Sequence, residues 1–424
     1  MKKVIFSLVL GMSAMAQAQS YVHQVYVLNE GNFDYVTNTQ IVPVTLGTYN
    51  PQTQVYSVLD TLENMRFASD LVISGDYFYV AADAKILKYS KLTNQLITEV
   101  ACPGVRNLGV YQNKLVATRG EYLSTFNSYL HIYNTTDLSL IAAIDTVSGP
   151  KWATQNIVID GSTAYVAINN GYEWGNEKGL IGALNLATLT YGNEVDLGVN
   201  GKNPDNLVKI GNYIVAVNNK DWSGSSISRV DLSNNTVITE NLSLASTGCG
   251  TSCVREGNIS YQIAYDITVN EWNVLAMANV GPVNNLALSY YELAEDETNH
   301  LLYASNTDYT SYGKVYVYDQ SNNEVTNFDA GVAPGTIVFD VRSSLGMNEL
   351  SSEFKVMPNP ATGKATISGN YIGTVQLLNT LGQVIETTNM NMNTSIDVSS
   401  IEPGTYFIKC IDLPSHSTIK LIVE

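Results

Sequence analysis

Short segments in which every second residue is hydrophobic recur along residues 25–342, and Gly, Asn or Pro bounds each of them. A period of two predicts β-strands joined by tight turns. The clearest copy, residues 68–100, contains four such segments. Its first pair of strands recurs at residues 156–168 and 206–217, and less closely at 107–118 and 286–303. A helical repeat is excluded, because no window sustains the period of about 3.6 residues that an amphipathic helix requires.

The turns that open these units predict a propeller. They fall at Arg66, Pro103, Pro150, Pro204, Cys253, Pro282 and Pro334. The spacings run from about 30 to about 50 residues, the range of a four-stranded propeller blade. We therefore expect an all-β fold, a seven-bladed β-propeller; six blades are possible because the stretch after Cys253 is irregular.

The two ends of the repeat region complement each other. The segment after Pro334 begins a unit that has only one strand, whereas the N-terminal segment 25–58 lacks a first strand. The C-terminal strand can therefore complete the N-terminal blade and close the ring. Closure of this kind removes exposed sheet edges.

The N-terminus predicts export. Lys2 and Lys3 precede an apolar run, and Ala16-Gln17-Ala18 is a small-x-small cleavage pattern, so residues 1–18 are predicted to be a signal peptide. A retained anchor helix is the alternative, but the apolar run is shorter than the roughly 20 residues that a membrane span needs. We assign residues 19–342 to the propeller.

The composition favours β-structure and excludes one class of function. The chain is 45% hydrophobic but only 14% charged, with 27 Tyr and 31 Gly, which suits strands and turns. A net charge of −17 argues against a nucleic-acid-binding protein, since binding to phosphate groups requires a basic surface. We interpret the acidity as solubility outside the cell.

The Cys and His residues indicate at most one disulfide and no metal site. Cys249 and Cys253 are close enough to form a disulfide in an oxidising compartment, although short spacing does not guarantee the geometry. Cys102 and Cys410 are expected to be free. The four His residues have no metal-ligand spacing, so we expect no metal and no cofactor.

The C-terminal region has a different pattern. Residues 343–353 are polar and are predicted to be a linker, and residues 354–424 contain short alternating strands bounded by Gly, Asn or Pro. These features predict a small β-sandwich. The segments Phe354-Lys-Val-Met-Pro-Asn-Pro, 375–385, 395–398, 404–409 and 420–423 resemble the type A sorting domain of the type IX secretion system. The resemblance implies a partner, the type IX machinery, and export across the outer membrane to the cell surface or the extracellular space. An immunoglobulin-like carbohydrate-binding domain is the alternative.

The propeller region also resembles a known group. Val25-Tyr-Val-Leu-Asn-Glu-Gly-Asn-Phe, the paired strands and the segment 305–319 are similar to the YncE-like surface propellers of Bacteroidetes. That group includes proteins that capture vitamin B12, so the resemblance implies a corrinoid as a candidate ligand. Those proteins are typically lipoproteins, whereas no lipidation cysteine follows the apolar run in this chain.

Aromatic residues point to a ligand-binding face. In a propeller, the loops between the second and third strands and the loops between blades lie on one face, where ligands usually bind. Aligning the repeats predicts aromatic side chains on that face, namely Phe33, Tyr35, Tyr122, Trp152, Tyr172, Trp174, Trp222, Tyr309 and Tyr312. The fourth Trp, Trp272, is expected in the core. Polar candidates in the same turns are Asn29, Arg66, Arg106, Asn156, Asn203, Asp205, Arg255 and Asn284. Aromatic rims stack on sugar rings or on a flat macrocycle.

Three functions remain open. The first is capture of a small nutrient, a corrinoid or a glycan, without catalysis. The second is adhesion to another envelope protein. The third is an enzyme that uses loop carboxylates for calcium binding or acid–base chemistry, for which the candidates are Glu30, Asp34, Glu121, Glu173, Asp221 and Asp308. We expect no enzyme, because no nucleophile–base cluster and no phosphate-binding Gly loop is present.

Overall fold

The structure is a computed structural model that describes residues 19–221, 223–248, 251–344, 354–411 and 418–424. It separates into two compact units, one of residues 20–342 and one that contains residues 343–424. The described residues contain strands and no helix, so none of them forms a helix that could cross a membrane. The predicted signal peptide and most of the predicted linker lie outside the described residues.

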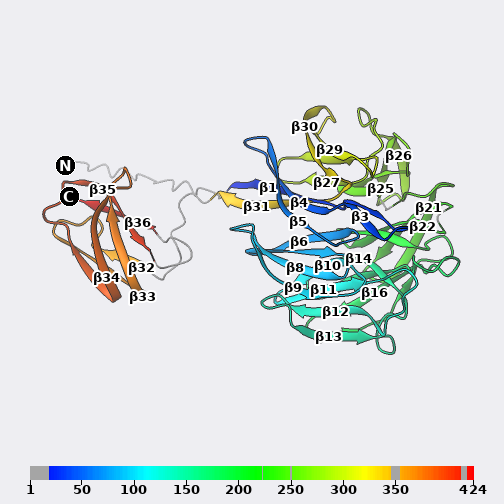
Figure 1. Ribbon diagram of the computed structural model, residues 1–424, viewed down its shortest axis with the longest axis horizontal. Coiled ribbons are helices and arrows are strands. Elements are labelled where there is room, and N and C mark those ends of the chain that lie inside the picture. The colour runs from blue at the N-terminus through cyan, green and yellow to red at the C-terminus, as the bar shows by residue number, and fades with distance from the viewer. Residues whose placement is uncertain (1–18, 222, 249–250, 345–353, 412–417) are drawn as a thin grey trace, which may run out of the picture. The chain divides into compact units, whose positions relative to one another are not determined.

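The first unit is a ring of seven antiparallel sheets, which we number as blades 1–7 (Figure 1). The first strand named for each blade lies at the centre of the ring, and the last lies at its outer edge. Blade 1 is β31 (Pro334–Ser344), β1 (Gln19–Asn29), β4 (Val44–Asn50) and β5 (Val55–Leu62). Blade 2 is β6 (Ala68–Ser74), β7 (Tyr77–Ala82), β8 (Lys85–Ser90) and β9 (Leu96–Ala101). Blade 3 is β10 (Val105–Tyr111), β11 (Lys114–Arg119), β12 (Ser128–Asn134) and β13 (Leu140–Asp145).

Blade 4 is β14 (Thr154–Asp160), β15 (Thr163–Ile168), β16 (Leu180–Asn185) and two short pieces, β17 (Thr190–Tyr191) and β18 (Val195–Asp196). Blade 5 is β19 (Pro204–Ile210), β20 (Tyr213–Asn218), β21 (Ser225–Asp231) and β22 (Thr236–Ser243). Blade 6 is β23 (Ser252–Arg255), β24 (Asn258–Gln262), β25 (Val269–Asn273) and β26 (Ala278–Pro282). Blade 7 is β27 (Leu293–Asp296), β28 (Leu301–Asn306), β29 (Tyr312–Tyr318) and β30 (Glu324–Val332). A hairpin of β2 (Asn32–Asp34) and β3 (Thr39–Val42) is inserted in blade 1.

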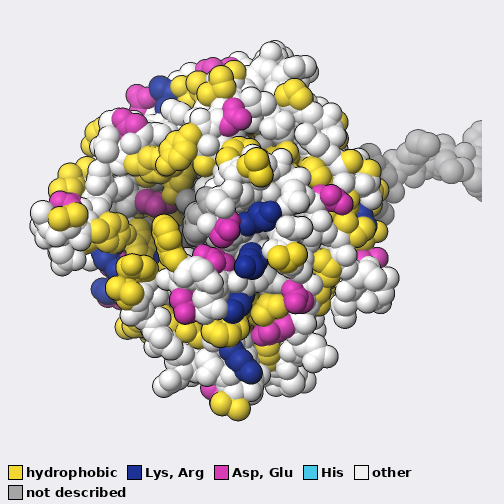
Figure 2. Space-filling view, turned by 90° about the vertical axis from the view of Figure 1, so that its right-hand side faces the viewer, with side chains coloured by type: hydrophobic (Ala, Val, Ile, Leu, Met, Phe, Trp, Pro, Cys, Tyr) yellow, Lys and Arg dark blue, Asp and Glu magenta, His cyan; other side chains and the backbone are white. Residues whose placement is uncertain are grey.

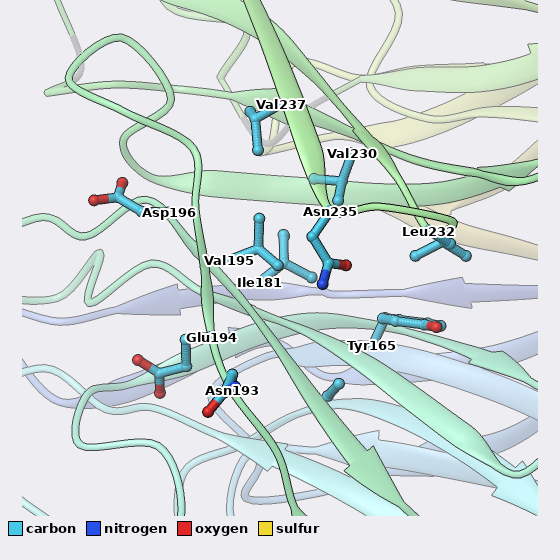
Figure 3. Close-up of a pocket in the computed structure, with 11 residues that line it drawn as sticks. Tyr165, Ile181, Asn193, Glu194, Val195, Asp196, Val230, Leu232, Asn235 and Val237 are labelled. Atoms are coloured by element: carbon cyan, nitrogen blue, oxygen red, sulfur yellow. The ribbon is translucent and has the colours of Figure 1, made fainter.

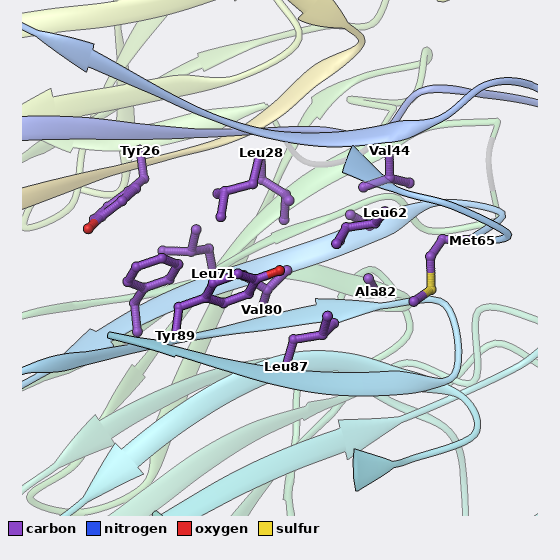
Figure 4. Close-up of a cluster of buried hydrophobic side chains, with 13 residues drawn as sticks. Tyr26, Leu28, Val44, Leu62, Met65, Leu71, Val80, Ala82, Leu87 and Tyr89 are labelled. Atoms are coloured by element: carbon purple, nitrogen blue, oxygen red, sulfur yellow. The ribbon is translucent and has the colours of Figure 1, made fainter. Parts of the chain in front are cut away.

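The core consists of apolar clusters between neighbouring blades. Seven clusters fill the seven blade interfaces, including the one between blade 7 and blade 1. Figure 4 shows the cluster between blades 1 and 2, where Tyr26 and Leu28 of β1 face Leu71 and Tyr89 of blade 2. Strand alternation produces this arrangement, because each sheet packs its two faces against two neighbours. The predicted propeller is confirmed, and the irregular stretch after Cys253 does form a blade.

The predicted closing strand is also confirmed. β31 is the innermost strand of blade 1 and pairs with β1 (Figure 1). The backbone N–H of Glu30 donates to the carbonyl of Ala333, at 2.9 Å. The fully buried Asn29 side chain adds a second link, because its Oδ1 accepts from the N–H of Gly331 and its Nδ2 donates to Thr45 and Tyr56.

The second unit contains β32 (Phe354–Met357), β33 (Lys364–Leu378), β34 (Val384–Asp397), β35 (Gly404–Cys410) and β36 (Thr418–Val423). β33 and β34 are long, which corrects the expectation of short strands only. β33 pairs with β34 along its length, with β32 at its start and with β35 at its end. A register shift between Ser368 and Ile372 lets one strand serve both pairings, as bulges do where a sheet turns a corner.

We predict that Asn29→Ala destabilises the ring at its closure. It removes buried hydrogen bonds and leaves the N–H of Gly331 unsatisfied, at an expected cost of about 2–4 kcal/mol. Chemical denaturation of the propeller measures this free energy of unfolding. Asn234→Ala, in the exposed β21–β22 turn, is the control and is expected to cost about 0.5 kcal/mol. Equal effects of the two changes would contradict a role for Asn29 in closure.

Candidate functional site

The candidate site lies on the face that the sequence predicted, which we call the mouth face. It consists of the loops between the second and third strands and the loops between blades. Figure 2 shows a face of the propeller where Lys and Arg side chains gather near the centre, Asp and Glu side chains surround them, and a hollow lies beside them.

A repeated backbone irregularity lies where the innermost strands leave this face. The register of the first two strands shifts near the start of β6, β10, β14 and β19, in four consecutive blades. Each shift contains polar residues, namely Ser69, Arg106 and Asn107, Gln155 and Asn156, and Asp205. Bulges redirect side chains and are frequent beside functional sites. The same register shift therefore recurs around the mouth of the propeller in blades 2 to 5.

Asp or Asn at the third position of the innermost strand links several of these blades. Asp70 of blade 2 accepts from the N–H of Leu108 in blade 3, at 2.7 Å. Asn206 of blade 5 donates through Nδ2 to the carbonyl and to Oγ of Ser252 in blade 6, at 3.0 and 2.9 Å. Burial raises the pKa of Asp70 to about 6. These side chains stabilise the blade interfaces at the mouth.

Two arginines form the centre of the site. Arg66 pairs with Asp83 at 2.5 Å and with Glu121 at 2.8 Å. The Arg106 guanidinium lies 4.9 Å from the centre of the Phe67 ring and 4.4 Å from that of Tyr172. Cation–π contacts of this kind hold a charged group in a fixed position. Blades 2, 3 and 4 thus meet in one network of charges and rings.

The predicted Tyr35 belongs to the same region. Burial raises the pKa of its hydroxyl, and the charges of Arg66 and Arg106 lower it in part. The Tyr35 side chain is nevertheless 66% exposed and its ring is 5.0 Å from that of Phe33. The β2–β3 hairpin therefore carries an aromatic pair beside the arginines.

A second group of contacts joins blades 7 and 1. The hydroxyl of Tyr291 donates to Oε1 of Glu30, and the ring of Tyr291 lies 5.2 Å from that of Tyr309. Asn32 donates to the carbonyl of Tyr309 at 3.2 Å. Burial raises the pKa of Glu30 to about 7, and burial together with the charges of Asp70 and Glu30 raises that of Glu292 well above its usual value.

Blades 4 and 5 complete the mouth. The hydroxyl of Tyr172 donates to Oε1 of Gln155 at 3.2 Å, and Asp205 accepts from Nδ2 of Asn219 at 2.9 Å. Burial raises the pKa of Asp205 to about 7, although hydrogen bonds from Asn219 and Gln155 lower it in part. Asn203 is buried, and its Nδ2 has no hydrogen-bond partner among the described residues.

Most of the predicted aromatic residues are exposed on this face. The exposed fractions are 59% for Tyr122, 79% for Trp174, 46% for Tyr309 and 79% for Tyr312. Trp152 is half-buried, with the ammonium of Lys178 4.4 Å from its ring centre. Asn156 is half-buried in β14 and Asn284 is exposed in the loop before blade 7. Trp222 lies outside the described residues, and Trp272 is buried, as predicted.

Arg255 does not belong to the site, which corrects the prediction. It ends β23 and lies on the opposite face, where it donates to the carbonyl of Asp319 at 2.8 Å and pairs with Glu295 at 3.3 Å. The sequence placed a turn at Cys253, but the strand already begins at Ser252. Arg255 is therefore at the far end of a four-residue strand.

The predicted disulfide between Cys249 and Cys253 is not tested by the described residues. Cys253 is buried and is a free thiol in the described structure, whereas Cys249 lies outside the described residues. The pairing stays a prediction.

The loop carboxylates proposed for catalysis mostly cap their own loops. Asp34 accepts from Thr37, Asp221 from Ser223 and Asp308 from Ser311. These hydrogen bonds lower the pKa of each carboxyl. Side chains bound in this way stabilise turns. Among the carboxylates of the sequence analysis, Glu121 pairs with Arg66 and Glu30 accepts from Tyr291.

Sequence reasoning missed several residues of the mouth, namely Phe67, Asp70, Asp83, Gln155, Asn219, Tyr291 and Glu292. The recurrence of Asp70, Asn107, Asn156 and Asn206 directly before an apolar strand was a usable signal. Phe67, Gln155 and Tyr291 act through contacts between blades, which the sequence does not show.

Comparison with known proteins identifies the C-terminal unit. Residues 355–424 match the family described as the secretion system C-terminal sorting domain. The protein carries a type IX sorting domain. It is therefore exported through the type IX machinery to the cell surface or the extracellular space. No curated protein sequence matches the chain.

Solved structures resemble the propeller in fold. A hypothetical selenium-binding protein from Sulfolobus tokodaii aligns with a TM-score of 0.55 and 9% identity, covering 76% of this chain and 94% of that one. A proposed 6-phosphogluconolactonase from Bacteroides fragilis aligns with a TM-score of 0.52 and 12% identity, covering 75% of this chain and 98% of that one. At these identities the likeness shows the fold alone.

The raised carboxyl pKa values predict a dependence of stability on pH. A carboxyl whose pKa is higher in the folded state binds a proton that the unfolded state has already lost, so stability falls as pH rises through the folded value. We expect the melting temperature to fall between pH 6.5 and 8, a window in which Glu30 and Asp205 ionise. His131, whose pKa burial lowers to about 4, opposes this fall only at the acidic end of the window, where the imidazole of the unfolded chain still binds protons.

Asp205→Asn removes one of these carboxyls and should make the fall smaller, as measured by calorimetry. Asp221→Asn is the control, because that exposed carboxyl is ionised throughout the window in both states and should leave the fall unchanged. A wild-type melting temperature that rises over this window would contradict the assignment.

The sorting domain predicts the fate of a truncated chain. A protein that ends at residue 343 lacks the element that the type IX machinery recognises and should remain inside the outer membrane. Protease accessibility of whole cells and fractionation measure its location, with the full-length chain as the control. Surface display of the truncated chain would contradict the role of residues 354–424.

Proposed function

We propose that this protein is a surface-displayed, non-enzymatic β-propeller that captures a small ligand, a glycan or a corrinoid, on the mouth face. The observation that carries the proposal is the set of exposed aromatic side chains on that face. Tyr35, Tyr122, Trp174, Tyr309 and Tyr312 come from four different blades. Exposed aromatic rings leave apolar surface in contact with water, and a ligand ring that stacks on them covers that surface.

The chemistry at the centre suits a polar ligand. Arg66, Arg106, Glu121 and Asp205 provide fixed donors and acceptors below the aromatic rim. Glycans and corrinoids both combine flat or ring-shaped apolar surface with many hydrogen-bonding groups. Groups already held in position bind such a ligand at a smaller cost in conformational entropy.

The shape of the site suits a ligand that spans several blades. The exposed rings of the mouth face come from blades 1, 3, 4 and 7, so a ligand that stacks on more than one of them would contact several loops at once. A glycan chain and a corrin ring are both wide enough to do so.

Adhesion to an envelope protein is the second candidate, and one observation favours it. Aliphatic side chains on the mouth-face loops are also strongly exposed, with 94% for Val36, 86% for Leu123 and 94% for Leu244. Aliphatic groups suit a protein partner better than a sugar.

Fluorescence titration of residues 19–343 with cobalamin and with a panel of glycans tests ligand capture. We expect saturable quenching by one of them, and binding about 5- to 150-fold weaker after Trp174→Ala combined with Tyr122→Ala, since each stacked ring contributes roughly 0.5–1.5 kcal/mol.

Leu92→Ala is the matched control, because Leu92 is 74% exposed in the β8–β9 turn of the opposite face. The absence of quenching by every ligand would reject capture. Retention of an envelope protein on the mouth face, lost with Val36→Asp and Leu123→Asp, would then favour adhesion.

A further inference from the structure

Blade 4 departs from the repeat at its outer side and leaves a cavity of about 510 Å³ against blade 5. The apolar side chains of Ile181, Val195, Val230 and Val237 lie around its centre in Figure 3. Ile181 and Val195 belong to blade 4, whereas Val230 and Val237 belong to blade 5. Its volume is within the range of small-molecule sites.

The first cause of the cavity is a broken fourth strand. The other six blades each have one continuous outer strand of five to nine residues. In blade 4 the outer strand is split into β17 and β18, which pair with opposite ends of β16. Residues 192–194 join the pieces, so the outer strand that covers the other blades is incomplete in blade 4.

The second cause is a small residue in the third strand. Two residues before the end of this strand, blade 2 has Lys88 and blade 5 has Arg229, whereas blade 4 has Ala183. Lys88 reaches the carbonyl of Thr136 in blade 3 at 2.8 Å, and Arg229 reaches the carbonyls of Val274 and Leu275 in blade 6 at 2.7 and 2.8 Å.

Each of these long cations therefore bridges to the outer turn of the next blade. Ala183 cannot reach the corresponding turn of blade 5, where Leu232 and Asn235 line the cavity instead. The space that Lys88 occupies between blades 2 and 3, and that Arg229 occupies between blades 5 and 6, is empty between blades 4 and 5.

The charged side chains among the residues that line the cavity are all acidic. Glu194 and Asp196 are the charged residues among the described lining residues, and both carboxylates lie to one side of the apolar centre in Figure 3. The hydroxyl of Tyr191 donates to Glu194 at 2.9 Å, and the N–H of Gly198 donates to Asp196 at 2.8 Å. Both residues are exposed, and these hydrogen bonds hold their carboxylates at the outer rim of the cavity.

We propose that this cavity is a second binding site, for a small organic cation that has an apolar body and an ammonium group. The apolar body would lie among Ile181, Val230 and Val237, and the ammonium would face Glu194 and Asp196. The ring of Tyr165, which also lines the cavity, offers a cation–π contact. This site is separate from the mouth face and does not depend on the function proposed for it.

The test uses three probes that share one body and differ in charge, namely 1-naphthylmethylammonium, 1-naphthylmethanol and 1-naphthoate. Fluorescence titration of the full chain should give saturable binding of the ammonium. The alcohol should bind about fivefold more weakly, since exposed carboxylates contribute up to about 1 kcal/mol. The naphthoate should show no saturation.

Two sets of variants distinguish the effect of filling the cavity from the effect of its carboxylate charges. Ala183→Leu and Ala183→Arg fill the space and should abolish binding, whereas Ser57→Leu and Ser57→Arg on the exposed strand β5 should not change it. The neutral Leu variant keeps the test valid if the Arg variant fails to fold. Glu194→Gln combined with Asp196→Asn should bring the affinities for the ammonium and the alcohol together.

Two results would overturn the proposal. One is the absence of saturable binding of the ammonium probe by the wild-type chain. The other is binding that survives Ala183→Leu in a folded variant, because the probe would then lie elsewhere on the molecule.

Discussion

The structure of the propeller depends on the pairing of β31 with β1. Each sheet packs both faces against neighbours, so the first and last blades are stable only if the ring is closed. The closing strand contributes to two interfaces, since Ile337 packs against the cluster of blades 7 and 1 and Val338 against the cluster of blades 1 and 2. Just before β31 begins, the N–H of Gly331 donates to Asn29 and the N–H of Glu30 donates to the carbonyl of Ala333. An open ring would expose two sheet edges to other chains.

The mouth face departs from the regular pattern of the blades in its strand register and in its buried carboxyl groups. Four consecutive blades carry the same register shift at the start of the innermost strand, and this irregularity brings polar side chains towards one another. Burial disfavours the charged forms of Glu30, Asp205 and Glu292. Carboxyls with strongly raised pKa values are frequent at functional sites. The cost is tolerated because the surrounding apolar interfaces are extensive.

The sequence predicted the architecture because the fold repeats. The period of two, the recurring turns and the incomplete first and last units were enough to expect blades and their closure. Arg255 was misplaced because the loop before blade 6 is long and its strand is short, so the nearest turn signal indicated the wrong end of the strand. Phe67, Gln155 and Tyr291 were missed because their partners belong to other blades. Contacts between blades depend on how the sheets are rotated about the axis, which local patterns do not encode.

The role of Ala183 could not be predicted from the local sequence pattern either. An alanine in a strand carries no signal by itself, and it becomes informative only beside Lys88 and Arg229 at the equivalent positions. The broken outer strand of blade 4 was visible as a polar, Asn- and Gly-containing segment, but such segments also form ordinary hairpins. The cavity could be recognised only when the two departures were found to face the same blade interface.

The direction of the innermost strands determines how the propeller can be held. Each of them starts at the mouth face and runs to the opposite face, and β31 is the last of the series. The chain therefore leaves the ring at the back, beside the point where β1 enters it. A force applied through the C-terminal end of β31 would therefore act on the face opposite the mouth.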